Sequence, residues 1–146
     1  MKFDELVRIY NNKKGRYKSL LLELQELRDL GALPRTGENE GMPTSKSATS
    51  SVENYVIRVD TIERQTKGID EQLLVIRGYI MQIIDKIVDI YTRRIVELCT
   101  FRNGRAPDWR QIANSVNYSE RHTKRLYEIG LSQIQNIDME VNCEYI

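Results

Sequence analysis

An uninterrupted heptad pattern in the middle of the chain constrains the fold more than any other feature of the sequence. Twelve positions recur at alternating steps of three and four residues, and only Thr66 among them is not apolar. The positions are Val52, Tyr55, Val59, Ile62, Thr66, Ile69, Leu73, Ile76, Ile80, Ile83, Ile87 and Ile90. Such a repeat draws one apolar stripe along an α-helix and is typical of a coiled-coil seam. We therefore predict a long helix over residues 51–91, with Ser51 as its N-cap.

A seam of this length needs an apolar partner. Residues 1–30 are predicted to be an N-terminal helical segment, because leucines recur there at helical spacing, at Leu20, Leu21, Leu24, Leu27 and Leu30. A shorter helix is expected before them, separated by Asn11–Gly15, and Gly31 is the expected C-cap. This segment can fold back along the seam as an antiparallel hairpin, or a second copy can cover it, and we expect both, hence a homodimer. Further apolar residues widen the face beyond Leu73 and indicate burial on more than one side, at Leu74, Val75, Tyr79, Met81, Ile84, Val88 and Tyr91.

Residues 31–50 are predicted to be a flexible linker. The stretch GALPRTGENEGMPTSKSATS is rich in Gly, Pro, Ser and Thr. Pro34 and Pro43 exclude one continuous helix across it. The predicted fold class is therefore all-α: an N-terminal helix, a linker, a long heptad-patterned helix and a C-terminal helical segment.

The segment 92–137 has the pattern of a helix-turn-helix. Asn103-Gly104 is expected to end a first helix, and Pro107 to open a short helix. Asn114–Tyr118 is the predicted turn, in which Val116 is an apolar pin, and Ser119 is the predicted N-cap of the last helix. The inward positions of that helix are predicted to be Thr123, Leu126, Gly130, Leu131 and Ile134.

Charge is distributed unevenly although the whole chain has a formal net charge of only +1. Residues 92–137 hold eight basic and four acidic residues, whereas the tail 138–146 holds three acidic residues and no basic ones. A locally basic segment is the electrostatic footprint of a nucleic-acid binder. The tail is either disordered or competes with DNA for the basic face, and the sequence leaves both open.

The outward face of the last helix carries the predicted DNA-reading residues. A major groove admits one helix, whose first turns reach the base edges. Arginine pairs bidentately with guanine, and a carboxylate accepts from cytosine. The predicted base-reading residues are Glu120, Arg121, Lys124 and Arg125. The predicted contacts to the DNA backbone are Ser119, Arg105, Arg110 and His122. Trp109 is interpreted as core packing rather than a base-stacking platform, and Glu97 as a residue that either faces solvent or pairs with an arginine.

The pattern RRIVEL…F…G…DWRQIA…VNYSERHTKRL…GL over Thr92–Ile134 resembles the sigma-factor region-four-like domain of phage regulators of the ArpU and RinA type. The front half, YKSLLLELQELRDLGALP followed by SSVENYVIR, is also similar to ArpU-type proteins. The resemblance implies a phage or prophage transcription regulator that activates late genes, binds double-stranded promoter DNA and contacts RNA polymerase. Two departures are a loop Arg102–Asp108 about three residues longer than the family pattern, and Cys99-Thr100 where the family has Arg-Tyr.

Three other functions are alternatives to a DNA-binding regulator. An enzyme is disfavoured, since the sequence has no Gly-rich phosphate loop, no nucleophile paired with a base and no metal-ligand spacing. We accordingly expect no catalytic residues, no metal and no cofactor. A DNA-packaging protein like a small terminase subunit is the main alternative, and it would form a ring. A protein-binding adaptor that uses the fold without DNA is the third.

The expected location is the cytoplasm of a bacterial host cell, in association with the nucleoid. No apolar run approaches the roughly 20 residues that a membrane span needs, and the start of the sequence, with Asp4 and Glu5, lacks the apolar core of a signal peptide. Cys99 and Cys143 fit no metal or redox spacing, so both are expected to be reduced thiols, with Cys99 buried.

Overall fold

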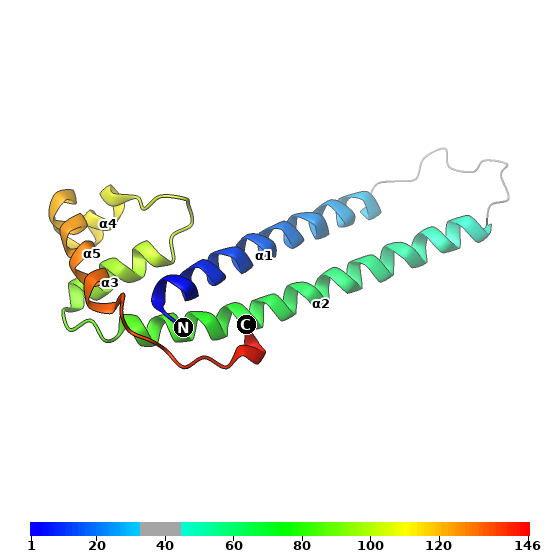
Figure 1. Ribbon diagram of the computed structural model, residues 1–146. Coiled ribbons are helices and arrows are strands. Elements are labelled where there is room, and N and C mark those ends of the chain that lie inside the picture. Colours follow the sequence, from blue (N-terminus) through cyan, green and yellow to red (C-terminus); the bar gives the residue numbers. More distant parts are fainter. Residues whose placement is uncertain (33–44) are drawn as a thin grey trace. The chain divides into compact units, whose positions relative to one another are not determined.

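The computed structural model describes residues 1–32 and 45–146, and this part of the chain is all-α, as predicted. Its elements are α1 (Phe3–Ala32), α2 (Ser45–Ile84), α3 (Ile90–Thr100), α4 (Trp109–Val116), α5 (Glu120–Ile134) and the 3-10 turn η1 (Cys143–Tyr145), shown in Figure 1. Within the described ranges no helix has both the length and the apolar character of a membrane span.

The chain divides into two compact units. The first, here called the head unit, contains Met1–Asn11 and Leu74–Ile146, and the second, the hairpin unit, contains Asn12–Leu73. Both divisions fall inside helices, because α1 and α2 each contribute residues to both units. The unit boundaries therefore differ from the segment boundaries predicted from composition.

In the hairpin unit, α1 packs antiparallel along the predicted seam of α2. The apolar side chains buried there are Leu24, Ile62, Ile69 and Leu73. Polar pairs cross between the helices in antiparallel register: Arg28 donates to Glu63 at 2.8 Å, Arg58 pairs with Glu23, and Lys13 donates to Gln72 at 2.8 Å. The intramolecular partner that the leucine spacing predicted is thus confirmed, whereas a second copy of the chain remains a prediction.

The helices of the hairpin unit start and end differently from the prediction. α1 runs without interruption through Asn11–Gly15 and includes Gly31, which therefore is not a C-cap. Ser51 lies inside α2 and does not cap it, since α2 begins at Ser45. Of the predicted linker 31–50, residues 33–44 lie outside the described part, and the remainder is helical. Packing against α2, to which Lys13 donates a hydrogen bond, outweighs the weak helix propensity of Asn and Gly in Asn11–Gly15.

The predicted single helix 51–91 is wrong at its C-terminal end. α2 stops at Ile84, and Asp89 caps a separate helix α3: its Oδ2 accepts from the Thr92 backbone N–H at 2.9 Å and from the Thr92 hydroxyl at 2.6 Å. These hydrogen bonds lower the pKa of Asp89, and the one from the Thr92 hydroxyl contributes most. Arg93 closes the turn by donating to the Ile87 carbonyl at 2.9 Å.

The break at Asp89 redirects the end of the heptad stripe. The stripe is buried from Ile76 to Ile87 inside the head unit, but its last member, Ile90, is 71% exposed. Leu74, Val88 and Tyr91 were predicted to widen the buried face, and all three are exposed instead. The prediction followed the heptad periodicity past Asp89, although Asp89 is the N-cap of a new helix.

The core of the head unit gathers residues from both ends of the sequence. Phe3, Leu6 and Tyr10 of α1 are buried, as are Ile95 and Val96 of α3 and Ile134 of α5. The ring of Tyr10 meets Phe101 edge-on, with 5.4 Å between their centroids. The guanidinium of Arg77 lies over the ring of Phe101, 4.4 Å from its centre. The start of α1 is therefore an integral part of this unit.

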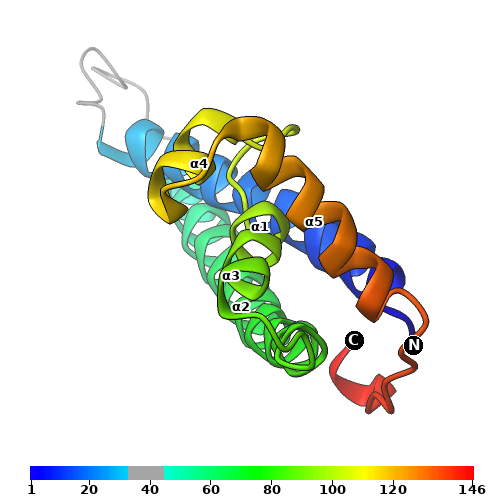
Figure 2. The ribbon, with the colours of Figure 1, turned by 90° about the vertical axis from the view of Figure 1, so that its left-hand side faces the viewer.

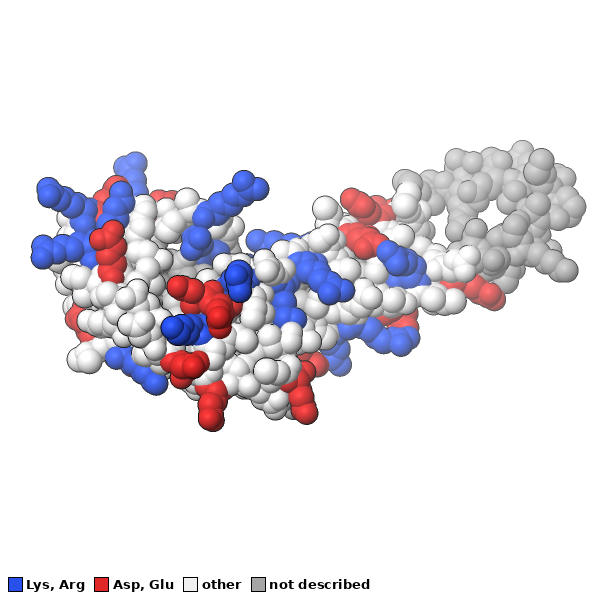
Figure 3. Space-filling model, viewed as in Figure 1, with Lys and Arg blue, Asp and Glu red and all other residues white. Residues whose placement is uncertain are grey.

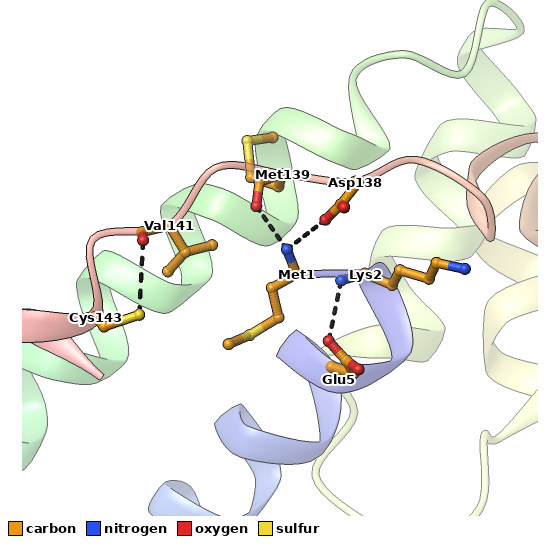
Figure 4. Close-up of polar contacts among 7 residues, drawn as sticks. All are labelled: Met1, Lys2, Glu5, Asp138, Met139, Val141 and Cys143. Atoms are coloured by element: carbon orange, nitrogen blue, oxygen red, sulfur yellow. Dashed lines mark hydrogen bonds and ion pairs between the residues drawn. The ribbon is translucent and has the colours of Figure 1, made fainter.

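The acidic tail packs against the start of α1 (Figure 4). The Met1 amino group donates to Asp138 Oδ1 at 2.5 Å and to the Met139 carbonyl at 2.7 Å. The Met139 N–H donates back to the Met1 carbonyl at 2.9 Å, and the Asn142 N–H donates to the Tyr79 hydroxyl at 3.2 Å. The hydrogen bond from the amino group lowers the pKa of Asp138. The first part of the tail is thus ordered by contacts inside the head unit.

The two cysteines are expected to differ sharply in reactivity. Cys99 is fully buried, as predicted, and burial raises the pKa of its thiol from 9.0 to about 11, whereas Cys143 is exposed. Because the thiolate is the nucleophile, iodoacetamide at pH 8 should modify Cys143 in the native protein and Cys99 only after unfolding. Mass spectrometry of timed samples measures both rates, and equal native rates would contradict the burial of Cys99.

Candidate nucleic-acid interface

Helices α3, α4 and α5 of the head unit pack on one another (Figure 2) and share a small core of their own. Its buried members are Ile95, Cys99, Ile112 and Val116. Partly buried side chains pack around them: Leu98, Trp109, Tyr118, Leu126 and Tyr127. Trp109 meets Tyr127 edge-on at 5.4 Å between ring centroids, so the interpretation of Trp109 as core packing is confirmed. This core fixes α4 and α5 on α3.

The side chain of Arg102 holds the loop between α3 and α4 by hydrogen bonds to main-chain carbonyls. Its guanidinium donates to the Cys99 carbonyl at 2.7 Å and to the Arg105 carbonyl at 3.0 Å. Asp108 then caps α4 by accepting from the Gln111 N–H at 3.2 Å. Pro107 therefore precedes the cap, rather than lying in the first helical turn as predicted.

A tight turn joins α4 to α5. α4 continues to Val116, so the predicted turn Asn114–Tyr118 is too long: Asn117 and Tyr118 alone separate the last helical residue from the cap. Asn117 takes the left-handed conformation, with φ 58° and ψ 36°. Ser119 is the N-cap, as predicted, and its hydroxyl oxygen accepts from the His122 N–H at 3.2 Å. Val116 is buried between the helices, which confirms its predicted place.

Substitutions at Asn117 are expected to separate backbone conformation from side-chain contact. A β-branched residue is strained in the left-handed region, so Asn117→Val should destabilise the protein by about 1–2 kcal/mol. Asn117→Gly should be neutral or slightly stabilising, since glycine adopts this conformation freely. Urea unfolding gives both values, and equal losses for the two variants would mean that the exposed Asn117 side chain, not its φ angle, matters.

The inward face of α5 is the predicted one. Thr123, Gly130 and Ile134 are buried, and Leu126 and Leu131 are partly buried. Gly130 lies at a close approach of α5 to α3: a Cβ placed there would come within 2.6 Å of Val96 Cγ2 and 2.9 Å of Thr92 Cγ2. The absence of a side chain at Gly130 lets the two helices touch.

All four predicted base-reading residues, Glu120, Arg121, Lys124 and Arg125, are exposed on α5. They do not share one direction, because the Lys124 ammonium lies over the ring of Trp109 in α4, 5.8 Å from its centre. Sequence reasoning missed this contact. In Figure 3, Lys and Arg side chains project from the part of the head unit formed by α4 and α5.

The four residues predicted to contact the DNA backbone occupy different settings. Arg105 and Arg110 are exposed, the first in the loop before α4 and the second in α4. His122 is exposed, and its ring meets Tyr118 edge-on at 4.8 Å between centroids, while Tyr118 meets Tyr91 at 5.6 Å. The Ser119 hydroxyl is engaged in the cap.

Glu97 is the remaining residue of the head unit for which the sequence suggested a role. Glu97 pairs with Arg94 at 3.3 Å, which is the second of the two roles expected for it. Among the described residues, no group of three His, Cys, Asp or Glu side chains lies together as metal ligands would.

In comparisons with known proteins, no family model, no curated protein and no solved structure matches this chain. Function is therefore inferred from the geometry of α3, α4 and α5 and from the sequence pattern.

Proposed function

We propose that this protein is a sequence-specific DNA-binding transcription regulator in which α5 is the recognition helix. The observation that carries the proposal is the tight connection of α4 to α5 through Asn117 and the Ser119 cap, followed by a helix with an exposed basic face. Two helices joined by a turn of this length are the supporting frame of helix-turn-helix DNA binders.

In this proposal, α5 enters the major groove with its N-terminal turns against the base edges. Arg121 and Arg125 are long enough to pair with guanine O6 and N7, and Glu120 can accept from cytosine N4. Arg105, Arg110 and His122 lie outside the face of α5 centred on Arg121 and Arg125, and are assigned to the phosphate backbone.

The finer assignment rests on the residue pattern of Thr92–Ile134 alone. We propose a phage or prophage regulator that activates late-gene promoters, contacts RNA polymerase and works as a homodimer near the nucleoid. Analytical ultracentrifugation across a concentration series tests the assembly. A dimer supports the regulator, whereas a ring of eight or more subunits would favour the DNA-packaging alternative.

Selection of bound duplexes from a random-sequence library tests the proposed function. We expect one enriched motif, and a log–log plot of affinity against salt with a slope of several units, because each neutralised phosphate releases counterions. An inverted repeat with half-sites about one helical turn apart would support the dimer. No enrichment, together with binding that does not depend on salt, would refute a DNA-binding function.

A further inference from the structure

We infer that the basic side chains of α5 have two separate tasks: Arg121 and Arg125 read bases, whereas Lys124 binds a backbone phosphate from its place on Trp109. The inference rests on the proposed function and deepens it, because it removes Lys124, and with it Glu120, from the base-reading group to which the sequence pattern assigned them. It follows from the directions of the side chains around α5 and from the contact of Lys124 with α4.

Helical spacing gives these directions relative to the buried face of α5. Thr123 is fully buried and, with Gly130 and Ile134, marks the side that packs inside the head unit. At about 100° per residue, Arg121 and Arg125 each lie about 160° from Thr123. Both therefore point almost directly away from the rest of the head unit, side by side and four residues apart. Lys124 lies only about 100° from Thr123, on the flank of the helix, and Glu120 lies about 60° from Thr123 on the same side.

The flank that carries Lys124 faces α4. Tyr127, one turn further along the same flank, packs against Trp109 of α4. The Lys124 ammonium lies 5.8 Å from the centre of the same indole ring, within the range of a cation–π interaction. The contact holds Lys124 toward α4 and away from the direction of the two arginines.

The opposite flank of α5 is built in a similar way. His122 lies about 100° from Thr123 on the other side, and its ring rests edge-on against Tyr118. Each flank thus carries one polar side chain that rests on an aromatic ring outside α5. The central face between them holds Arg121, Arg125 and Glu128, all exposed.

The dimensions of DNA turn this arrangement into a division of tasks. The major groove is about 12 Å wide, and a helix with its side chains is about 10–12 Å across. A helix inserted in the groove therefore presents its central face to the bases and its flanks to the two sugar–phosphate walls. The chemistry of the side chains agrees, since the planar guanidinium matches guanine and the compact ammonium acts as a point charge for phosphate.

Binding measurements on selected and random duplexes separate the two tasks. Lys124→Ala should weaken binding to both DNAs by the same factor, lower the salt slope by about 1 and leave the preferred sequence unchanged. Lys124→Gln keeps part of the aliphatic stem but not the charge, and should weaken binding to both DNAs as Lys124→Ala does, because the charge makes the contact. Arg125→Ala should instead change the base preference at one position of the motif.

Trp109 provides a second readout, because it is the only tryptophan of the chain. When a backbone phosphate pairs with the Lys124 ammonium beside the indole ring, the fluorescence of Trp109 should change on DNA binding. The same change should be absent in Lys124→Ala. Circular dichroism of each variant checks that the helices are intact.

The outcomes distinguish this inference from the proposed function. If Lys124→Ala abolishes the preference for one base and leaves the salt slope unchanged, Lys124 reads a base and the division is wrong, while the DNA-binding function stands. If the parent protein enriches no sequence and binds no DNA, the proposed function fails, and the assignment of Lys124 fails with it.

Discussion

Gly130→Val is expected to destabilise the head unit by about 3 kcal/mol, at the upper end of what overpacking of a close contact costs. A Cβ at this position would lie 2.6 Å from Val96 Cγ2 and 2.9 Å from Thr92 Cγ2, both on α3. Neither atom belongs to a long flexible side chain, so α5 itself must move away from α3. Urea unfolding followed by Trp109 fluorescence reports the loss, because that residue lies in the head unit.

Gly78→Ala is the matched control for Gly130→Val. Gly78 belongs to the part of α2 in the head unit, and no heavy atom lies within 4 Å of a Cβ built there. Alanine should therefore stabilise the protein by up to about 1 kcal/mol through helix propensity alone. If Gly130→Val unfolds at the urea concentration of the parent protein, α3 and α5 are not in close contact at Gly130.

The double variant Arg121→Ala/Arg125→Ala is expected to lose most of the discrimination between the selected motif and a scrambled duplex. Each bidentate contact with a base contributes about 1–3 kcal/mol, so two should account for roughly 4 kcal/mol, or a ratio of dissociation constants on the order of 10³. Both side chains are exposed, and their removal should leave the free energy of unfolding nearly unchanged. Fluorescence anisotropy with the two labelled duplexes gives the ratio.

Arg16→Ala/Lys18→Ala provides the control for the loss of charge. Both residues are exposed on α1 in the hairpin unit. Their removal also takes away two positive charges, as the removal of Arg121 and Arg125 does. This variant should keep the parent's ratio between the two duplexes. If it loses discrimination as the Arg121→Ala/Arg125→Ala variant does, net charge rather than direct contact by α5 determines specificity.

The order of the helices and the position of the turn before α5 were predictable from the sequence. Ser119 was identified as the N-cap, and Thr123, Gly130 and Ile134 as inward positions, and the structure confirms each. These features depend on interactions over a few residues, such as a hydroxyl that accepts from an N–H three positions on. The seam from Ile62 to Ile87 was likewise readable, because one stripe of a helix must be buried.

The end of α2 could have been predicted from Asp89. Aspartate is a preferred N-cap residue, and here its side chain accepts from the N–H of Thr92 at the start of α3. The heptad pattern extended past it and favoured one long helix instead. Both signals are local, and only the packing of Ile87 inside the head unit, with Val88 and Ile90 outside, decides between them.

What the sequence by itself determined was the all-α class, the need of the seam for an apolar partner, and the residues that α5 exposes. Only the tertiary structure decided that α1 passes unbroken through Asn11–Gly15, that the acidic tail binds the start of α1, and that Lys124 rests on Trp109. Each of these depends on residues far apart along the chain or in different helices. Periodicity and capping describe one helix at a time, whereas the free energy of packing between helices determines which side chains meet.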